Sequence, residues 1–260
     1  MKQEKKITKW KRGGKMIVLA FLVGITLRFF VVESVYVSTP QMEKTYSKGD
    51  LLFVSKLAYG LHLPFSSLYF SIKQVRRNEI VLIKLPVSSA KFLTRCVGIP
   101  GDTVIASGNK LTINGKDALL PPTLLMTTDK GEQLSKVEWY LSEEAQGAKI
   151  PLSPTENALS YTVIVPKAGM KVSLEALKAM PLYEVILIDE NAGTPVIFKN
   201  NSLYIDGKKQ TSYTFKRNYY WVLSDNREEG FDSRHFGFVP EQNIQGKAMG
   251  VWMHLNLPFL

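Results

Sequence analysis

Short apolar runs separated by turn residues extend from about residue 50 to the C-terminus, and they predict a mainly β protein. Five such runs, rich in β-branched and aromatic residues, are predicted as strands: 51–55, 79–84, 161–165, 219–223 and 248–252. Two further strands lead into Asn114-Gly115 and Asp206-Gly207, dipeptides that favour a two-residue hairpin turn. Helical spacing of the apolar residues at 170–180 predicts one short helix.

A longer apolar segment precedes these strands. Residues 16–37, 22 in all, carry Arg28 and Glu33 as their only charges. About 20 apolar residues suffice to cross a hydrocarbon core of about 30 Å, and charged residues near one end reach the interface. The segment is therefore predicted to be a transmembrane anchor. A cleaved secretory signal fits less well, because the sequence 34–36 lacks small residues at both key positions. A buried soluble helix is the remaining alternative.

The net charge of +10 comes largely from a basic tail. Residues 1–15 carry seven Lys or Arg and one acid, while the other 245 residues share 26 basic and 22 acidic groups. Since basic residues flank membrane spans on the cytoplasmic side, the tail is predicted to be cytoplasmic and residues 38–260 to lie across the lipid bilayer. The rest of the chain lacks the aromatic and basic motifs of a nucleic-acid partner.

The titratable residues outside the tail suggest neither a disulfide nor a metal site. Cys96 is the single cysteine, and it lies in an apolar run where a core position is expected. His62, His235 and His254 lie far apart, and no cluster has metal-ligand spacing. No metal and no cofactor are therefore expected.

Three boxes carry the chemical information. Residues 38–49 have the sequence STPQMEKTYSKG, residues 94–102 TRCVGIPGD, and residues 224–237 SDNREEGFDSRHFG. Together they resemble the boxes of bacterial signal peptidase I, peptidase family S26, which removes signal peptides from exported proteins. The third box is the most specific, because Asp-Asn-Arg, Asp-Ser-Arg and Gly-Phe-Val-Pro are improbable by chance at this spacing.

The resemblance implies a fold and a location. It implies a signal peptidase I-like β fold, preceded by one N-terminal transmembrane helix. The domain boundaries are then a tail at 1–15, an anchor at 16–37 and an extracytoplasmic β domain at 38–260, with an inserted β subdomain at about 103–217. The protein would cross the bacterial inner membrane once. The apolar loop at 61–72 would either cover the core or lie against that membrane.

The residues that the family uses for catalysis are replaced in this chain. A serine hydroxyl needs a base, and this family supplies a buried neutral lysine that a second serine orients. Gln41 stands at the nucleophile position, Thr94 at the lysine position and Gly230 at the position of the orienting serine. An amide forms no acyl-enzyme, and a threonine hydroxyl is no general base at neutral pH. Thr39 matches the hydroxyl that helps to bind the oxyanion.

The positions that the resemblance assigns to structure are retained. Arg95 with Asp225, and Asp232 with Arg234, match two ion pairs of the family, and Gly98 and Pro100 match a tight turn. The full set expected to support the site is Met42, Arg95, Gly101, Asp102, Asp225, Asn226, Arg227, Asp232, Ser233 and Arg234.

Neighbouring residues replace the lost groups poorly. Ser38 and Lys91 each precede a vacancy by three positions, and an odd shift along a strand turns the side chain to the other face. Thr39 and Cys96 keep the face, but two residues displace a side chain by about 6.6 Å. Lys56 belongs to a different strand region.

Three functions follow from this sequence. The first is a catalytically silent signal peptidase homologue that binds signal peptides or preproteins, or that partners an active signal peptidase or a secretion-complex subunit. The second is an active peptidase with displaced catalytic residues. The third is a purely structural, membrane-anchored β protein.

Overall fold

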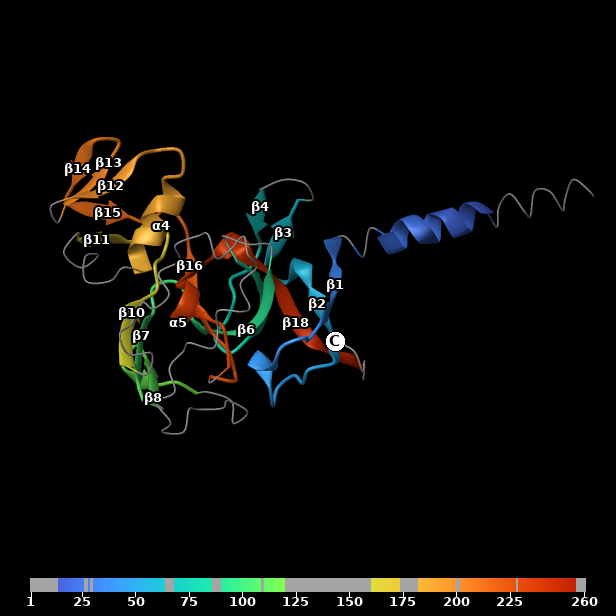
Figure 1. Ribbon diagram of the computed structural model, residues 1–260. Coiled ribbons are helices and arrows are strands. Elements are labelled where there is room, and N and C mark those ends of the chain that lie inside the picture. Colours follow the sequence, from blue (N-terminus) through green and yellow to red (C-terminus); the bar gives the residue numbers. More distant parts are fainter. Residues whose placement is uncertain are drawn as a thin grey trace, which may run out of the picture.

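The chain folds into a β-sheet body with a helix extending from it (Figure 1). In the computed structural model, the described residues are 14–25, 28, 30–63, 68–85, 90–108, 110–119, 160–173, 182–199, 202–227 and 229–255. Strands dominate these residues, as the spacing of apolar residues predicts. The architecture is therefore mainly β.

A seven-stranded sheet forms the centre, in the order β1-β2-β18-β5-β6-β16-β17. The bounds are β1 Val32–Tyr36, β2 Asp50–Ser55, β18 Ile244–His254, β5 Ile80–Lys84, β6 Lys91–Gly98, β16 Tyr219–Leu223 and β17 Val239–Pro240. All neighbouring pairs are antiparallel. The predicted strands at 51–55, 79–84, 219–223 and 248–252 are all confirmed within this sheet. Two short 3₁₀ helices, η2 (Lys56–Ala58) and η4 (Glu241–Asn243), lie beside its strands.

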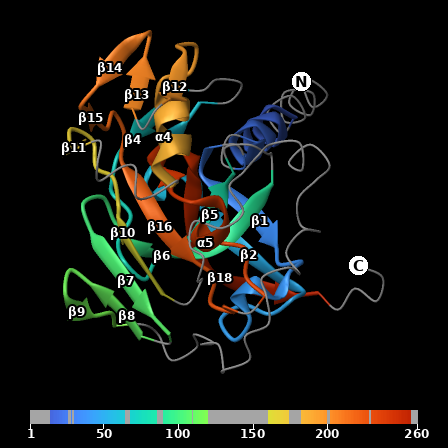
Figure 2. The same cartoon turned by 60° about the vertical axis from the view of Figure 1, so that its left-hand side comes forward.

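Four smaller sheets accompany the central one, and those formed by β7–β15 lie on one side of it (Figure 2). Three fall between residues 103 and 214, the region predicted as an inserted β subdomain. They consist of β10 Ser160–Ile164 with β7 Thr103–Ser107, β8 Lys110–Ile113 and β9 Lys116–Asp117; of β11 Lys171–Ser173 with β15 Ser212–Thr214; and of β12 Val196–Lys199, β13 Ser202–Ile205 and β14 Lys208–Gln210. The fourth is the hairpin of β3 Gly60–His62 and β4 Tyr69–Ser71.

Both predicted hairpin turns are present. Asn114 and Gly115 join β8 to β9, and Asp206 and Gly207 join β13 to β14, each residue with a positive φ. Two consecutive positive φ values define the turn whose twist matches that of the flanking strands. The dipeptides alone were therefore sufficient to locate these hairpins.

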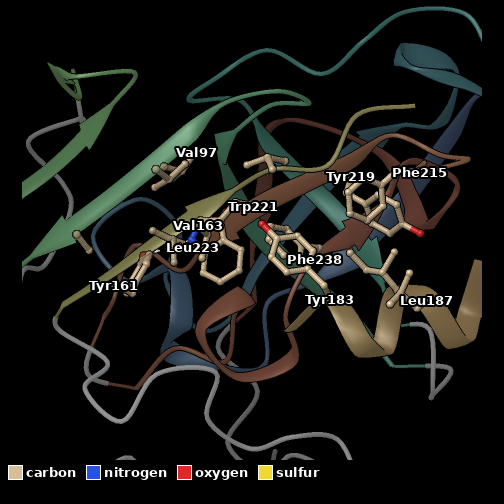
Figure 3. Close-up of a cluster of buried hydrophobic side chains, with 14 of the residues drawn as sticks. Val97, Tyr161, Val163, Tyr183, Leu187, Phe215, Tyr219, Trp221, Leu223 and Phe238 are labelled. Atoms are coloured by element: carbon tan, nitrogen blue, oxygen red, sulfur yellow. Dashed lines mark hydrogen bonds between the residues drawn. The ribbon is translucent and has the colours of Figure 1, made fainter. Parts of the chain in front are cut away.

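The largest apolar cluster joins the central sheet to the smaller sheets (Figure 3). Trp221 of β16 is fully buried, and its ring contacts Tyr161 of β10 and Phe238 at centroid distances of 5.5 and 5.1 Å. The Trp221 Nε1 donates to the Tyr161 hydroxyl at 3.2 Å. This packing fixes β10 and Phe238 against β16, the strand that leads into the third box.

Helices were predicted less well than strands. The predicted helix at 170–180 is wrong at its start, because Lys171–Ser173 is strand β11, paired with β15; the remainder lies outside the described residues. The sequence pattern also did not predict α4, Leu182–Glu190. The α4 sequence is rich in apolar and β-branched residues that suit a strand equally well, and packing against the core decides its conformation.

The N-terminal segment is helical from residue 14 to residue 25, and its apolar side chains are exposed rather than packed on the β body. Within the described residues, none of the helices combines the length and apolar character that crossing a bilayer requires. The predicted anchor at 16–37 is wrong at its C-terminal end. Val32–Tyr36 forms β1, because its five residues pair with β2 at the edge of the sheet.

Glu190 at the end of α4 is a buried hydrogen-bonding centre. Its carboxylate accepts from the hydroxyls of Tyr213 (2.7 Å) and Tyr219 (3.1 Å) and from the backbone N–H groups of Lys216 (2.8 Å) and Arg217 (3.0 Å). Four donors would lose their acceptor if this side chain were removed. Glu190 therefore ties α4 to β15 and to the segment that enters β16.

We predict that Glu190→Ala lowers the free energy of unfolding by about 3 kcal/mol, because each buried donor left unpaired costs about 1–3 kcal/mol before the structure relaxes. Urea denaturation followed by circular dichroism measures the change. Asp189→Ala is the matched control, since this neighbouring carboxylate is exposed and pairs only with Arg217 in the described structure. An equal loss in both variants would contradict the role of Glu190.

Candidate functional site

The first box begins with a turn that fixes Gln41 beside the third box. Thr39 precedes the 3₁₀ helix η1 (Pro40–Met42), and Met42 is fully buried in a core cluster with residues of β2. The N–H of Asn226 donates to the Gln41 carbonyl at 3.0 Å, and its side-chain amide donates to the Pro40 carbonyl at 3.3 Å. Gln41 itself is only 6% exposed.

The second box occupies β6 and the turn after it. Thr94 is fully buried opposite Val81 of β5, and its Oγ1 has no hydrogen-bond partner among the described residues. Cys96, two residues along on the same face, is also buried, and burial raises the pKa of its thiol well above the usual range. A thiol held in its neutral form is no nucleophile, in agreement with the predicted core role of Cys96.

The turn after β6 is fixed by Asp102. Gly101 has a φ of +95° and donates its N–H to the Val165 carbonyl. The Asp102 carboxylate accepts from Arg77 at 2.7 and 2.5 Å, from Asn114 and from the Ile99 N–H. Burial alone would raise the pKa of this carboxyl, but the Arg77 and Asn114 bonds outweigh it and lower the pKa. Asn114 therefore connects the second box to the end of β8, and Arg77 connects it to the segment before β5.

A buried ion pair connects the second box to the third. Arg95 donates two hydrogen bonds to Asp225, from Nε at 2.7 Å and from Nη2 at 2.5 Å, and both side chains are buried. Arg95 also donates to the Asn78 carbonyl at 2.8 Å, and Thr45 of the first box donates to Asp225 at 2.5 Å. All three boxes therefore meet at one carboxylate.

The third box is organised by Asp232. The carboxylate of Asp232 caps the short helix α5 (Ser233–Phe236), accepts from Arg234 at 2.9 and 3.0 Å, and accepts the N–H of Ser224 at 2.8 Å. Burial alone would raise the pKa of this carboxyl, but the charge of Arg234 outweighs it and holds the pKa far below the usual range. The hydroxyl of Ser233 accepts the N–H of Val222 at 2.9 Å. Residues 222–224 are therefore fixed by residues 232–233.

Two other residues of the third box, His235 and Arg227, differ in their side-chain hydrogen bonds. His235 completes a capping box, its Nδ1 accepting the Asp232 N–H at 3.1 Å, and its ring packs on Phe231. Arg227 was expected among the residues that support the site. Its Nε and Nη2 are buried, yet they have no hydrogen-bond partner among the described residues.

Ser224 is the residue of the site that sequence reasoning missed. A Cβ added to Gly230 would lie 2.2 Å from the Ser224 Cβ, 2.5 Å from its Oγ and 2.4 Å from the Asn226 carbonyl oxygen. Ser224 is fully buried, and its Oγ, like that of Thr94, has no hydrogen-bond partner among the described residues. The five residues that separate Ser224 from Gly230 give no periodic signal that the two are in contact.

The described side chains of the site are polar, but few of them can serve as a base or bind a metal. In the part of the chain that the structure describes, no lysine is buried, and no cluster of three metal-ligating side chains occurs. Lys91 lies at the exposed start of β6 and pairs with Glu33 of β1, so it does not approach Thr94 from within the core. The structure thus places Gln41, Thr94 and Gly230 near the same buried ion pair, and no buried lysine of the described chain accompanies them.

One edge of β6 is free next to Thr94. β5 pairs with residues 91–95 of β6, whereas β16 pairs only with residues 95–98. The N–H of Cys96 donates to the Glu79 carbonyl on the β5 side, so the backbone groups of residues 91 and 93 point away from β5. None of the described strands pairs with them there. A peptide segment that added along this edge would reach the N–H of Lys91.

We predict that Asp225→Asn destabilises the protein by about 3–5 kcal/mol, because it leaves the Arg95 guanidinium buried without its counter-ion. Asp117→Asn is the control, since the Lys110–Asp117 pair (3.1 Å) is exposed and should contribute less than about 1 kcal/mol. Chemical denaturation measures both. A loss below 1 kcal/mol in Asp225→Asn would refute a dependence of the three boxes on this pair.

Comparison with known proteins identifies the scaffold. The family model described as signal peptidase, peptidase S26, matches residues 10–167 and 209–253. Signal peptidase I of Buchnera aphidicola subsp. Baizongia pistaciae is 29% identical over 251 residues, which cover 92% of this chain and 74% of that protein. Signal peptidase I of Pseudomonas aeruginosa is 24% identical and is covered to 71%.

A solved signal peptidase I from Enterococcus faecalis is 24% identical and covers 68% of this chain, with a TM-score of 0.30. That score is too low to support any inference, so the assignment rests on the sequence matches. With the three boxes gathered at Asp225 and the family model matching most of the chain, this protein belongs to the signal peptidase family, peptidase S26.

Proposed function

We propose that this protein is a membrane-anchored signal peptidase homologue that binds an extended signal-peptide or preprotein segment without cleaving it. One observation carries the proposal. The residues that hold the scaffold are retained, while an amide and a threonine stand at the positions where the family has its catalytic serine and lysine. The ion pair between Arg95 and Asp225 and the Asp232 cap are in place around Gln41 and Thr94. The protein would act as a receptor within the export system.

The absence of a base near Thr94 supports the loss of cleavage. A serine or threonine hydroxyl attacks a peptide bond only when a neighbouring group accepts its proton. Among the described lysines, Lys56 has a pKa lowered by burial, but it lies on η2 and its charge environment is Glu33, Lys91 and Arg28 rather than the boxes. Thr39 stays the predicted oxyanion donor, half-buried at the start of η1.

The free edge of β6 supports the binding of an extended chain. A peptide that adds as a strand gains main-chain hydrogen bonds irrespective of its sequence, and side-chain pockets then select among peptides. Signal peptides vary in sequence, so recognition through the backbone suits them. The edge lies directly beside Thr94, which is where a scissile bond would lie in a cleaving relative.

Exposed apolar side chains support a position at a lipid surface. Phe53 of β2 stacks on Trp252 of β18 at 5.1 Å, and both are exposed to more than a third. On the β3–β4 hairpin, Leu68, Phe70 and Ile72 are also exposed. These hairpin residues do not cover the core, so of the two roles expected for the loop at 61–72 we propose contact with the bilayer. The apolar helix at 14–25 would supply the anchor.

Two other functions remain as outcomes of the experiments. A peptidase with displaced catalytic residues would cleave a preprotein as purified. A purely structural protein would neither cleave nor bind it. A partnership with an active signal peptidase is compatible with the proposed binding role, since both proteins would meet the same preprotein at the membrane.

We predict that the full-length protein in lipid nanodiscs binds a fluorescent signal peptide and leaves it intact. Lys91→Pro removes a backbone N–H from the free edge without breaking the β5 ladder, so it should weaken binding about 5-fold, the equivalent of one hydrogen bond of about 1 kcal/mol. Fluorescence anisotropy measures binding, and mass spectrometry of the same samples detects cleavage.

Lys91→Ala is the matched control, because it also loses the ion pair to Glu33 but keeps the N–H. It should bind as the unaltered protein does. Cleavage by the unaltered protein that disappears in Thr39→Ala would establish displaced catalysis instead. No binding at any concentration in a folded sample would favour the structural role.

A further inference from the structure

We infer that Ser224 supplies, beside Thr94, the side-chain hydroxyl that Gly230 lacks, so that the site has lost two of its working groups and has relocated the third. The inference rests on the proposed assignment of Gln41 and Thr94 to the lost dyad. Ser224 is a positioning residue in this scheme, since it would orient a neighbouring group and would not itself react.

The first step is steric. The Ser224 Cβ and Oγ lie 2.2 and 2.5 Å from the place where a side chain at position 230 would begin. Distances below 3.0 Å are essentially never observed for a real Cβ. The side chain of Ser224 therefore occupies the volume that a serine at position 230 would need, and the two side chains exclude one another.

The second step is the placement of that volume beside Thr94. Leu223 pairs with Arg95 across β16 and β6, and one further step along this antiparallel register sets Ser224 opposite Thr94. Opposite residues point to the same face, with Cβ atoms about 4.5–5.5 Å apart. Phe231 packs on Phe92 at 5.6 Å, and Phe92 shares the face of Thr94, so Gly230 also lies over this face.

The third step is the fixed position of the Ser224 backbone. Its N–H donates to the Asp232 carboxylate at 2.8 Å, and Val222, two residues earlier, donates to Ser233. Asp232 is held in turn by Arg234. A hydroxyl on so constrained a backbone has little freedom except rotation about its own Cα–Cβ and C–O bonds, which is what an orienting group requires.

The fourth step is the availability of the hydroxyl. The Oγ atoms of Ser224 and Thr94 are both fully buried, and neither has a hydrogen-bond partner among the described residues. A buried hydroxyl without a hydrogen-bond partner lowers the stability of the folded protein. Both hydroxyls would therefore gain a hydrogen bond from a polar group that enters between the strands. An amine at the end of a side chain from position 94 is such a group.

We predict from this that Gln41→Ser/Thr94→Lys cleaves a preprotein in detergent with Ser224 left in place. Adding Ser224→Ala should lower kcat about 10- to 100-fold and leave KM unchanged, because a misplaced amine slows proton transfer but does not alter peptide binding. Adding Gly230→Ser instead should abolish folding or activity, owing to the overlap with Ser224. An inactive double variant, or one that tolerates Ser224→Ala, would overturn the inference.

A second measurement does not depend on catalysis. Gly230→Ala should lower Tm by at least about 5 °C, and Ser224→Gly/Gly230→Ala should recover part of that loss, because the Asn226 carbonyl contact remains. Strict additivity of the two Tm shifts would overturn the steric step. Signal-peptide binding by these variants, tested as for Lys91→Pro, reports on the proposed function separately.

Discussion

The Asp225 carboxylate is the point on which the arrangement of the site depends. It is fully buried, and it holds Arg95 of β6 and Thr45 of the first box at the same time. A charge in this position is tolerated only because the guanidinium bonds both of its oxygens. Segments that are 50 and 130 residues away from Arg95 in sequence are thereby brought to one place. The proposed loss of cleavage leaves this requirement unchanged, because folding demands the ion pair whether or not a reaction takes place.

The site residues that match the family and those that differ from it are therefore under different physical constraints in this protein. Arg95, Asp225, Asp232 and Arg234 are each bonded to a partner that would be left charged or unpaired in the core. Gln41, Thr94 and Gly230 belong to neither of these ion pairs, so replacing them leaves no buried charge without its counter-ion. The frame of the three boxes is thus complete with Gln41, Thr94 and Gly230 in place.

Four strands of the central sheet, the two hairpin turns and both buried ion pairs could be predicted from the sequence, because each depends on local pattern or on a motif. Continuous apolar runs define β5 and β16. Asn114-Gly115 and Asp206-Gly207 define the turns that join β8 to β9 and β13 to β14. Helix α4 could not be predicted, since its apolar residues suit either conformation until they pack on Phe215 and Phe238. The end of the N-terminal helix was likewise placed too late, because the pairing of β1 with β2 overrides its apolar character.

The contact between Ser224 and Gly230 lay beyond sequence reasoning, because it arises from two turns folding onto one another. It also restricts the routes by which this site could have changed over time. A chain with serine at both positions would be too crowded to fold, so one-step substitutions between the two arrangements pass through a chain with glycine at both. Such an intermediate has no hydroxyl beside Thr94. On this route the serine cannot move from one position to the other in a single substitution.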